Sequence, residues 1–429
     1  MACRLSLSLL WSFAISLLAS VPLTRADSQI NPGFPYGSEK VRGANLGGWL
    51  VLEPWIAPSL FDDTGNDAIV DEWTFCQLQS NSVAKAALTN HWNTFYTEAD
   101  FEAIAAAGLN HVRLPIGYWA FEVGPGEPFI QGQLSYLQKA VTWAENHGLM
   151  VIVDLHGAPG SQNGFDNSGQ RMSFPHWHSN ATNVARTDAI IKTIASMFSE
   201  NENVVSVIAP LNEPAGFDGA DVLSVVKQYW YDSYGNIRFP FDSSQESNTL
   251  VLIHDAFQPL PYWSGFMPPP TFQGVALDTH IYQVFSDSDV ALSQTDHIST
   301  ACAVSSSGIA DFHLWTIVGE WAPAITDCAK YLNGRGVGAR YDGSYPGSTA
   351  VGNCAGMSRS ASTFSSSYKT FLRRFWEAQT IAYEAGQGWI QWTWKTEAGA
   401  GEEWSYQVGL AYGWIPQDPT ERIYTTICD

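Results

Sequence analysis

Eight short apolar runs, separated by longer stretches with helical spacing, constrain the fold of this chain more than any other feature. Apolar residues recur every three to four residues over 100–107, 134–147 and 188–200, as in amphipathic helices. The runs expected to be strands are residues 42–46, 111–116, 150–155, 204–211, 249–254, 275–280, 314–319 and 389–394. Such alternation predicts a parallel sheet covered by helices. Eight units favour a closed (β/α)8 TIM barrel, and 429 residues suit one barrel with loop insertions.

No linker or internal repeat divides the chain, so a single domain over residues 27–429 is expected. An open sheet that binds a nucleotide would need a glycine-rich phosphate loop after its first strand. The first run is followed instead by Gly47-Gly48-Trp49, in which the bulky indole makes a poor phosphate cradle. Nucleotide binding is therefore not expected.

The first 26 residues have the pattern of a secretory signal peptide. Arg4 supplies a basic start, residues 5–18 form an apolar run broken only by serines, and the small residues Thr24 and Ala26 precede Asp27. The run is shorter than the roughly 20 residues that span a bilayer, so a membrane anchor is not expected. The sequence therefore predicts secretion, and the sequon at residues 180–182 predicts a glycoprotein.

The formal net charge of −21 at pH 7 excludes several classes of partner. Such a chain repels nucleic acid and anionic membranes, whereas a neutral polymer is compatible with it. Most of the 18 Trp, 17 Tyr and 22 Phe are expected in the core, and the remaining rings suit stacking against the flat faces of sugars.

His176 and His178 lack a third metal ligand at a suitable spacing. No metal or organic cofactor is therefore expected, and nothing requires a partner subunit, so a monomer is expected.

The cysteines beyond the signal peptide are Cys76, Cys302, Cys328, Cys354 and Cys428. Five is an odd number, so at most two disulfides form within the chain and one thiol is left. Cys76 has apolar neighbours and is expected to be the buried free thiol.

Polar or aromatic side chains follow most of the predicted strands at the point where each strand ends. In parallel barrels these ends meet at one mouth, where the reacting groups lie. The residues placed in this way include Arg113, His156, Asn212, Glu213, His280, Tyr282, Glu320 and Trp394. So many polar ends at one mouth are hard to explain by packing, because each buried charge must be compensated. His254, Trp49, Trp119 and Trp392 are expected to be structural or core residues.

Two of these residues, Glu213 and Glu320, suit glycoside hydrolysis. That reaction needs one protonated carboxyl to assist the leaving oxygen and one ionised carboxylate to attack the anomeric carbon or activate water. A neighbouring cation keeps a carboxylate ionised. Arg113 is assigned that role.

Motifs over nearly the whole chain carry a family resemblance. They are RGANLGGWLVLEPW at 42–55, VRLPIGYW at 112–119, DLHGAPGSQNGFD at 154–166, LNEP at 211–214, HIY at 280–282, GEW at 319–321 and WTWKTE at 392–397. With these motifs in this order, the chain resembles glycoside hydrolase family 5 and, within it, the fungal exo-β-1,3-glucanases. Trp55, where a tyrosine is frequent in the family, and the glycine-rich residues 398–401 depart from the commoner pattern.

The resemblance implies a role for each matching residue. Glu213 would be the acid/base and Glu320 the nucleophile of a retaining reaction, for which the two carboxyls must lie roughly 5–5.5 Å apart. Asn212 would bind the sugar 2-hydroxyl. The residues implied to orient the glutamates and bind hydroxyls are Arg113, His156, His280 and Tyr282. The residues implied to contact the sugars are Glu53 and Asp166, Trp394 as a stacking floor beneath the terminal glucose, and the ring pair Phe165 and Phe285 around the next unit.

The family also implies the disulfides Cys302–Cys428 and Cys328–Cys354, with Cys76 reduced. The activity it implies is release of glucose from the non-reducing ends of β-1,3-glucan by an extracellular or cell-wall enzyme. An endo-acting β-glucanase or a glucanosyltransferase would share the motifs. A non-catalytic glucan-binding protein is a remote alternative, because both glutamates are intact.

Overall fold

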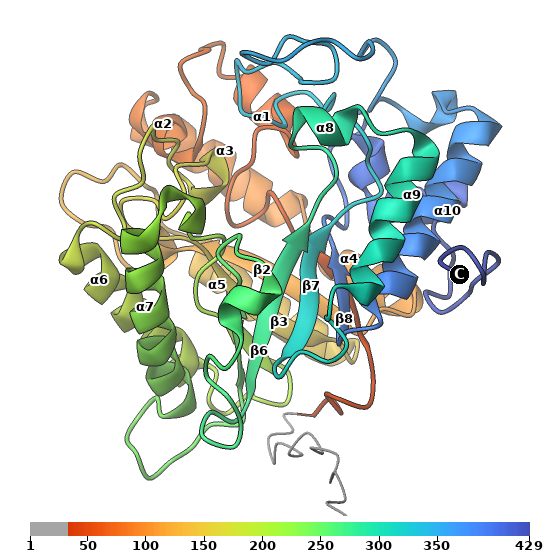
Figure 1. Cartoon of the computed structure of the whole chain (residues 1–429). Coiled ribbons are helices and arrows are strands. Elements are labelled where there is room, and N and C mark those ends of the chain that lie inside the picture. The colour runs from red at the N-terminus through yellow and green to blue at the C-terminus, as the bar shows by residue number, and fades with distance from the viewer. Residues whose placement is uncertain (1–32) are drawn as a thin grey trace, which may run out of the picture.

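Eight parallel strands close into a barrel in the computed structural model, which describes residues 33–429 (Figure 1). The strands are β1 (Val41–Asn45), β2 (His111–Gly117), β3 (Met150–Gly157), β4 (Val207–Ala209), β5 (Leu250–His254), β6 (Val275–Ile281), β7 (Trp315–Trp321) and β8 (Gly388–Gln391). Each strand pairs with the next, and β1 pairs with β8. The predicted (β/α)8 barrel is confirmed, while the signal peptide predicted over residues 1–26 lies outside the described residues.

Long helices surround the barrel and shorter ones lie in its loops (Figure 1). The longer helices are α3 (Asn81–Thr94), α4 (Glu98–Ala106), α5 (Gln133–Asn146), α6 (Ala181–Met197), α7 (Ala220–Arg238), α9 (Gln294–Ala303) and α10 (Ser366–Tyr383). The shorter helices are α1 (Pro58–Asp62), α2 (Glu72–Gln77), α8 (Asp287–Val290) and α11 (Tyr406–Tyr412). Helix α6 begins seven residues before the predicted start, because the Asn180 side chain accepts a hydrogen bond from the Thr182 amide and caps the helix there.

Two predicted strands are longer than the observed ones. The prediction of 204–211 was wrong at both ends, because β4 covers only Val207–Ala209. At the start, the amides of Val204 and Val205 bond to the carbonyl of Asn201 in a turn. Both side chains are buried, which accounts for the apolar run, and the Val204 carbonyl accepts from the Val151 amide of β3 although the ladder begins only at Val207. The prediction of 389–394 was wrong at its end, because the Thr393 amide bonds to the carbonyl of Trp404 in a loop and leaves the ladder.

The interior of the barrel is filled at its amino-terminal end. An apolar cluster joins inward-facing residues of seven strands with Phe34, which covers them; its buried members are Phe34, Val41, Ile152, Val207, Ala209, Leu250, Leu252, Ala276, Ile317 and Ile390. Because parallel strands end together, their polar last residues meet at the opposite, carboxyl end. A site can open only at that end, where α1 and α8 lie (Figure 1).

The cysteine predictions are confirmed. Disulfides join Cys302 to Cys428 and Cys328 to Cys354, and Cys76 is a buried free thiol. The first disulfide holds the C-terminal segment beside α9 and α10 (Figure 1).

Over residues 33–429, no helix has the length and apolarity needed to cross a bilayer.

Candidate active site

A pocket of about 510 Å³ lies at the carboxyl end of the barrel. Loops from most of the strands contribute its walls. Its lining residues are Glu53, Trp55, Gly164, Phe165, Asp166, Asn167, Arg171, Glu213, Phe257, His280, Tyr282, Phe285, Glu320, Leu332, Asn333, Gly334, Arg340, Tyr345, Trp392 and Trp404. Both predicted catalytic glutamates are therefore in one pocket, among aromatic rings.

Glu320 lies near the end of β7 and is held by two donors. Arg113 Nη1 donates to Oε1 at 2.8 Å, and the Tyr282 hydroxyl donates to Oε2 at 3.0 Å. The arginine is itself fully buried and donates to Asn212 Oδ1 at 2.7 Å. It also forms an ion pair with Asp154 at 3.1 Å. The carboxylates of Asp154 and Glu320 thus compensate the buried charge of Arg113. The planar guanidinium of Arg113 fixes the position of Glu320.

Glu213 follows β4 in an uncommon backbone conformation. Its φ of +45° lies in the left-handed region, which costs a non-glycine residue on the order of 1 kcal/mol and is common at functional sites. In this conformation its Oε1 lies 2.7 Å from His280 Nδ1. The strained backbone of Glu213 therefore accompanies the orientation of its carboxyl toward His280.

His280, from β6, bridges the two glutamates. Its Nδ1 lies 2.7 Å from Glu213 Oε1 and 3.5 Å from Glu320 Oε2. These two oxygens can be no farther apart than the sum of those distances, which is below the roughly 6.5–9.5 Å of inverting glycosidases. The other ring nitrogen lies 3.4 Å from Asp278 Oδ2. Carboxylates thus face both nitrogens of the ring.

This charge arrangement shifts the pKa values of all three groups. Burial alone would lower the pKa of His280, but the charges of Glu320, Asp278 and Glu213 raise it well above its ordinary value. Burial would raise the pKa of Glu213, but the hydrogen bond and charge of His280 lower it. Burial raises the pKa of Glu320, against the charges of His280 and Arg113. In the free pocket the proton therefore lies on the His280 side of its contact with Glu213.

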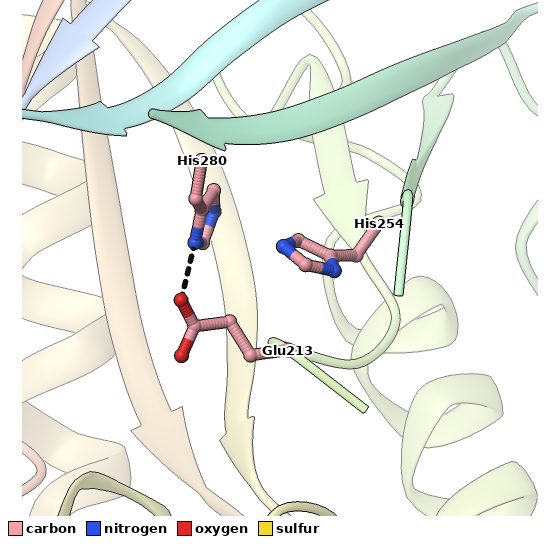
Figure 2. Close-up of side chains that lie close together, drawn as sticks. All are labelled: Glu213, His254 and His280. Carbon is pink, nitrogen blue, oxygen red and sulfur yellow. Dashed lines mark hydrogen bonds and ion pairs between the residues drawn. The ribbon is translucent and has the colours of Figure 1, made fainter. Parts of the chain in front are cut away.

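Glu213, His254 and His280 form the cluster that most resembles a metal site among the described residues, with potential ligand atoms within 4.8 Å of one another. Figure 2 shows both imidazoles beside the carboxyl and a dashed contact from His280 to Glu213. His254 Nδ1 accepts a hydrogen bond from the Ala256 amide at 3.0 Å, so the neutral ring carries its proton on Nε2 and has no lone pair there. The donor set suits proton sharing better than a metal ion.

Most predicted substrate-binding residues lie where a sugar could touch them. Those that line the pocket are Glu53, Phe165, Asp166, His280, Tyr282 and Phe285. Three others lie behind the glutamates: Arg113, His156 and Asn212 are buried and do not line the pocket. His156 bonds to Asp154 at 2.6 Å and stacks on Trp392 with ring centroids 5.5 Å apart. These residues therefore support the pocket wall from within.

Glu53, in the first loop, reaches the pocket through two hydrogen bonds. Its carboxyl accepts from the Gly48 amide at 3.0 Å and from the Trp55 indole at 3.1 Å. Burial, followed by the charges of Asp166 and Glu320, raises its pKa well above the ordinary value. This carboxyl is therefore fixed in orientation before any ligand arrives.

The prediction for Trp394 was wrong. Its indole is fully buried, donates to Asp100 at 3.3 Å and stacks on Tyr406 at 5.8 Å, so it does not line the pocket. Trp392, which was expected in the core, lines the pocket instead. The reason is local: β8 ends at Gln391, so residues two apart beyond it no longer share a face.

One wall of the pocket was not predicted from the sequence. Residues 332–345, which have no recognisable pattern, contribute Leu332, Asn333, Gly334, Arg340 and Tyr345 to the lining. Trp404 and Phe257 were also not predicted as pocket residues, although Phe257 follows a predicted strand.

One buried carboxylate organises this missed segment, which we call the rim loop (residues 327–354). Asp327 accepts from the Arg340 amide at 2.7 Å, the Tyr341 amide at 3.1 Å and the Asn333 side chain at 2.9 Å. The disulfide Cys328–Cys354 closes the loop at its base. The rim loop is thus fixed without regular secondary structure. It therefore has no helix or strand periodicity from which its position could be predicted.

Known proteins resemble this chain over most of its length. A sequence model of the cellulase family (glycosyl hydrolase family 5) matches residues 74–249. The chain is 45% identical to the probable glucan 1,3-beta-glucosidase A of Aspergillus niger over 97% of each chain. It is 46% identical to the glucan 1,3-beta-glucosidase of Blumeria graminis, over 96% of this chain and 94% of that one.

The barrel is also similar to that of solved structures. The rutinosidase from Aspergillus niger has a TM-score of 0.69 at 20% identity and covers 88% of this chain and 98% of its own. This likeness concerns the fold alone. With near full-length relatives at more than 40% identity, the chain is a glycoside hydrolase and belongs to glycosyl hydrolase family 5.

Proposed function

We propose that this hydrolase is a retaining exo-β-1,3-glucanase that releases glucose from the non-reducing ends of β-1,3-glucan. One observation carries the proposal: Glu213 and Glu320 both contact Nδ1 of His280 inside one pocket. The upper limit that these contacts set on the separation of the two oxygens lies below the roughly 6.5–9.5 Å of inverting glycosidases, which supports a retaining reaction. The names of the relatives, which are glucan 1,3-beta-glucosidases, supply the substrate class.

In the first step Glu320 attacks the anomeric carbon and Glu213 protonates the departing oxygen. The Glu320 carboxylate forms a bond to the anomeric carbon as the glucosidic C–O bond breaks, and the Glu213 proton goes to the leaving oxygen. Arg113 and Tyr282 hold the attacking carboxylate in line through their hydrogen bonds. A covalent glucosyl-enzyme results.

The proton for this step comes from His280. The raised pKa of His280 and the lowered pKa of Glu213, 2.7 Å away, favour that proton on His280 while the pocket is free. A bound sugar displaces water, and desolvation favours the neutral forms of both groups over the charged pair. When a sugar fills the pocket, the proton therefore moves from His280 to Glu213, and Glu213 can then act as the acid.

In the second step Glu213 acts as a base. It takes a proton from a water molecule, whose oxygen attacks the anomeric carbon and displaces Glu320. Two inversions return the original configuration. A sugar hydroxyl in place of water would give transglycosylation by the same route.

The rim loop supports action at chain ends. With Trp55 and Trp404 it lines the same pocket as the two glutamates, and this added wall favours a site that takes a chain end. A pocket of about 510 Å³ accepts the end of a chain more readily than its middle.

We further propose that the protein is secreted to the extracellular space or cell wall and acts as a monomer. The signal-peptide pattern and the two disulfides support secretion. The contacts that hold the two glutamates form within one chain, so the proposed chemistry requires no second subunit. The high negative charge gives nucleic acids and membranes no part in this function.

Products from laminarin at the earliest times test the proposal. Glucose alone, with β-configuration at release, is expected. A ladder of oligosaccharides would support endo cleavage, and products longer than the substrate would support glucanosyl transfer. Absence of turnover by the purified chain would favour a glucan-binding protein.

A further inference from the structure

Three exposed phenylalanines form a continuous row at the carboxyl end of the barrel. Phe165, Phe217 and Phe257 follow β3, β4 and β5, and 42%, 54% and 40% of their surfaces are exposed. The ring centroids of Phe165 and Phe217 lie 6.2 Å apart with 23° between the planes, and those of Phe217 and Phe257 lie 5.3 Å apart. We call these three side chains the phenylalanine row. Contiguous exposed apolar surface of this kind is typical of interaction and ligand-binding sites.

The row begins inside the pocket and continues outside it. Phe165 and Phe257 line the pocket, whereas Phe217, which touches both, does not. Phe217 therefore lies one ring beyond the wall that would hold the sugar after the terminal glucose. It is also the most exposed of the three.

The backbone holds Phe217 in place without a ligand. It lies in a short 3-10 helix, η3 (Gly216–Asp218), tied to the preceding loop by a bond from the Ala215 amide to the Gln162 carbonyl at 3.1 Å. At Gly216 an added Cβ would lie 2.2 Å from the carbonyl oxygen of Ala256, so only glycine permits this close approach of the two loops. The ring is thus presented on a preorganised segment.

We propose that Phe217 is a stacking platform for the third glucosyl unit of a bound β-1,3-glucan, counted from the non-reducing end. This inference rests on the proposed function. The terminal unit fills the pocket, the second lies against Phe165 and Phe285, and the third covers the exposed ring of Phe217. Pyranose rings have apolar faces that stack on aromatic side chains, and this contact needs no hydrogen-bond partner. Phe217 then determines preference for chains of three or more units.

The kcat/KM values for laminaribiose, laminaritriose and laminaritetraose test this platform. In the unchanged protein kcat/KM should rise from the two-unit to the three-unit substrate. Phe217→Ala should lower kcat/KM on the three-unit and four-unit substrates roughly three- to tenfold, as expected for one aromatic contact. It should change the two-unit value by less than about twofold. Phe217→Trp, which keeps a flat ring, should retain the rise.

Phe241→Ala is the matched control. Phe241 is 56% exposed, close to the exposure of Phe217, but it lies between α7 and β5 at the amino-terminal end of the barrel. This variant should leave all three values unchanged.

Two outcomes would overturn the inference alone. An equal loss on all three substrates would mean that Phe217 only supports Phe165 by packing, and no loss on any would mean that the ring contacts no substrate. Failure of the unchanged protein to release glucose from any of the three would overturn the proposed function, and the platform with it.

Discussion

At the bottom of the pocket, one imidazole nitrogen contacts two carboxylates, and this determines how each glutamate can act. Glu320 has fixed donors in Arg113 and Tyr282, whereas the hydrogen bond of Glu213 is to a group that can itself give or take a proton. A nucleophile needs the first environment and an acid/base needs the second.

Glu320→Gln should abolish turnover while leaving the fold intact. The amide cannot form the covalent intermediate, so kcat on laminarin should fall by on the order of 10⁴-fold or more. Glu403→Gln is a suitable control, because Glu403 is equally buried but does not line the pocket. Activity near that of the unchanged protein in Glu320→Gln would remove the nucleophile assignment.

Glu213→Ala should give a loss that depends on the leaving group. Glucan cleavage should fall roughly 10²- to 10⁴-fold, because acid assistance is lost. Aryl glucosides with acidic phenols need little assistance, so formation of the glucosyl-enzyme from them should be nearly unaffected. Pre-steady-state release of the phenol measures this step. An equal loss on every substrate would contradict the acid role.

For individual residues, the sequence predicted which ones belong to the site better than it predicted where each side chain lies. Both glutamates and six predicted substrate-binding residues line one pocket. The prediction for Trp394 was wrong because the chain leaves β8 after Gln391. Beyond that residue, the two-residue alternation of a strand no longer indicates which indole faces the site. His254 was expected to be structural, and only the folded barrel brings it beside Glu213.

Among the elements, the rim loop has no regular structure and yet forms a wall of the pocket. Asp327 holds it through bonds to the loop backbone and to Asn333. Such an arrangement depends on side-chain contacts across a turn rather than on a period in the sequence. The strands were predictable because their apolar runs repeat eight times, whereas nothing repeats in this loop.

Asp327→Ala should loosen the rim loop and weaken substrate binding. Loss of several hydrogen bonds to one buried carboxylate should raise KM for laminarin roughly five- to tenfold, with a smaller effect on kcat because Asp327 does not touch the glutamates. Asp342→Ala is the control, since that carboxylate, in the same loop, bonds to Ser344 two residues away. If kcat fell and KM stayed constant, the rim loop would not be a binding wall.

For the whole molecule, several buried carboxyls make stability depend on pH. Burial is the first cause that raises the pKa of each to about 7; these residues are Glu72, Asp166, Asp188, Asp255 and Glu403. In the unfolded chain the same groups titrate near pH 4. A raised folded pKa stabilises the protein below the unfolded pKa, and this stabilisation is lost as the pH rises through 7.

The melting temperature should therefore fall by a few degrees between pH 6.5 and pH 8. The raised pKa of His280 acts in the same direction over this interval. Buried histidines with lowered pKa values, such as His91 and His111, act in the opposite direction mainly below pH 6.5, where the unfolded rings take up protons. Calorimetry at the two pH values measures the difference.

Glu403→Gln should make that fall smaller. Its Oε1 accepts from the Ser358 hydroxyl, and an amide oxygen can accept the same bond without titrating. A melting temperature that is constant or rises from pH 6.5 to pH 8 would show that these carboxyls do not control stability.

The filled interior of the barrel has a consequence for how a polymer is consumed. Below the two glutamates lie Arg113, Asn45 and the apolar cluster, so nothing can pass through the cylinder. A glucose freed at the blind end has only one way out, and the remaining polymer blocks it. The polymer must let go after every cut, so digestion should be distributive, and its speed should follow the number of free ends rather than the length of the strands.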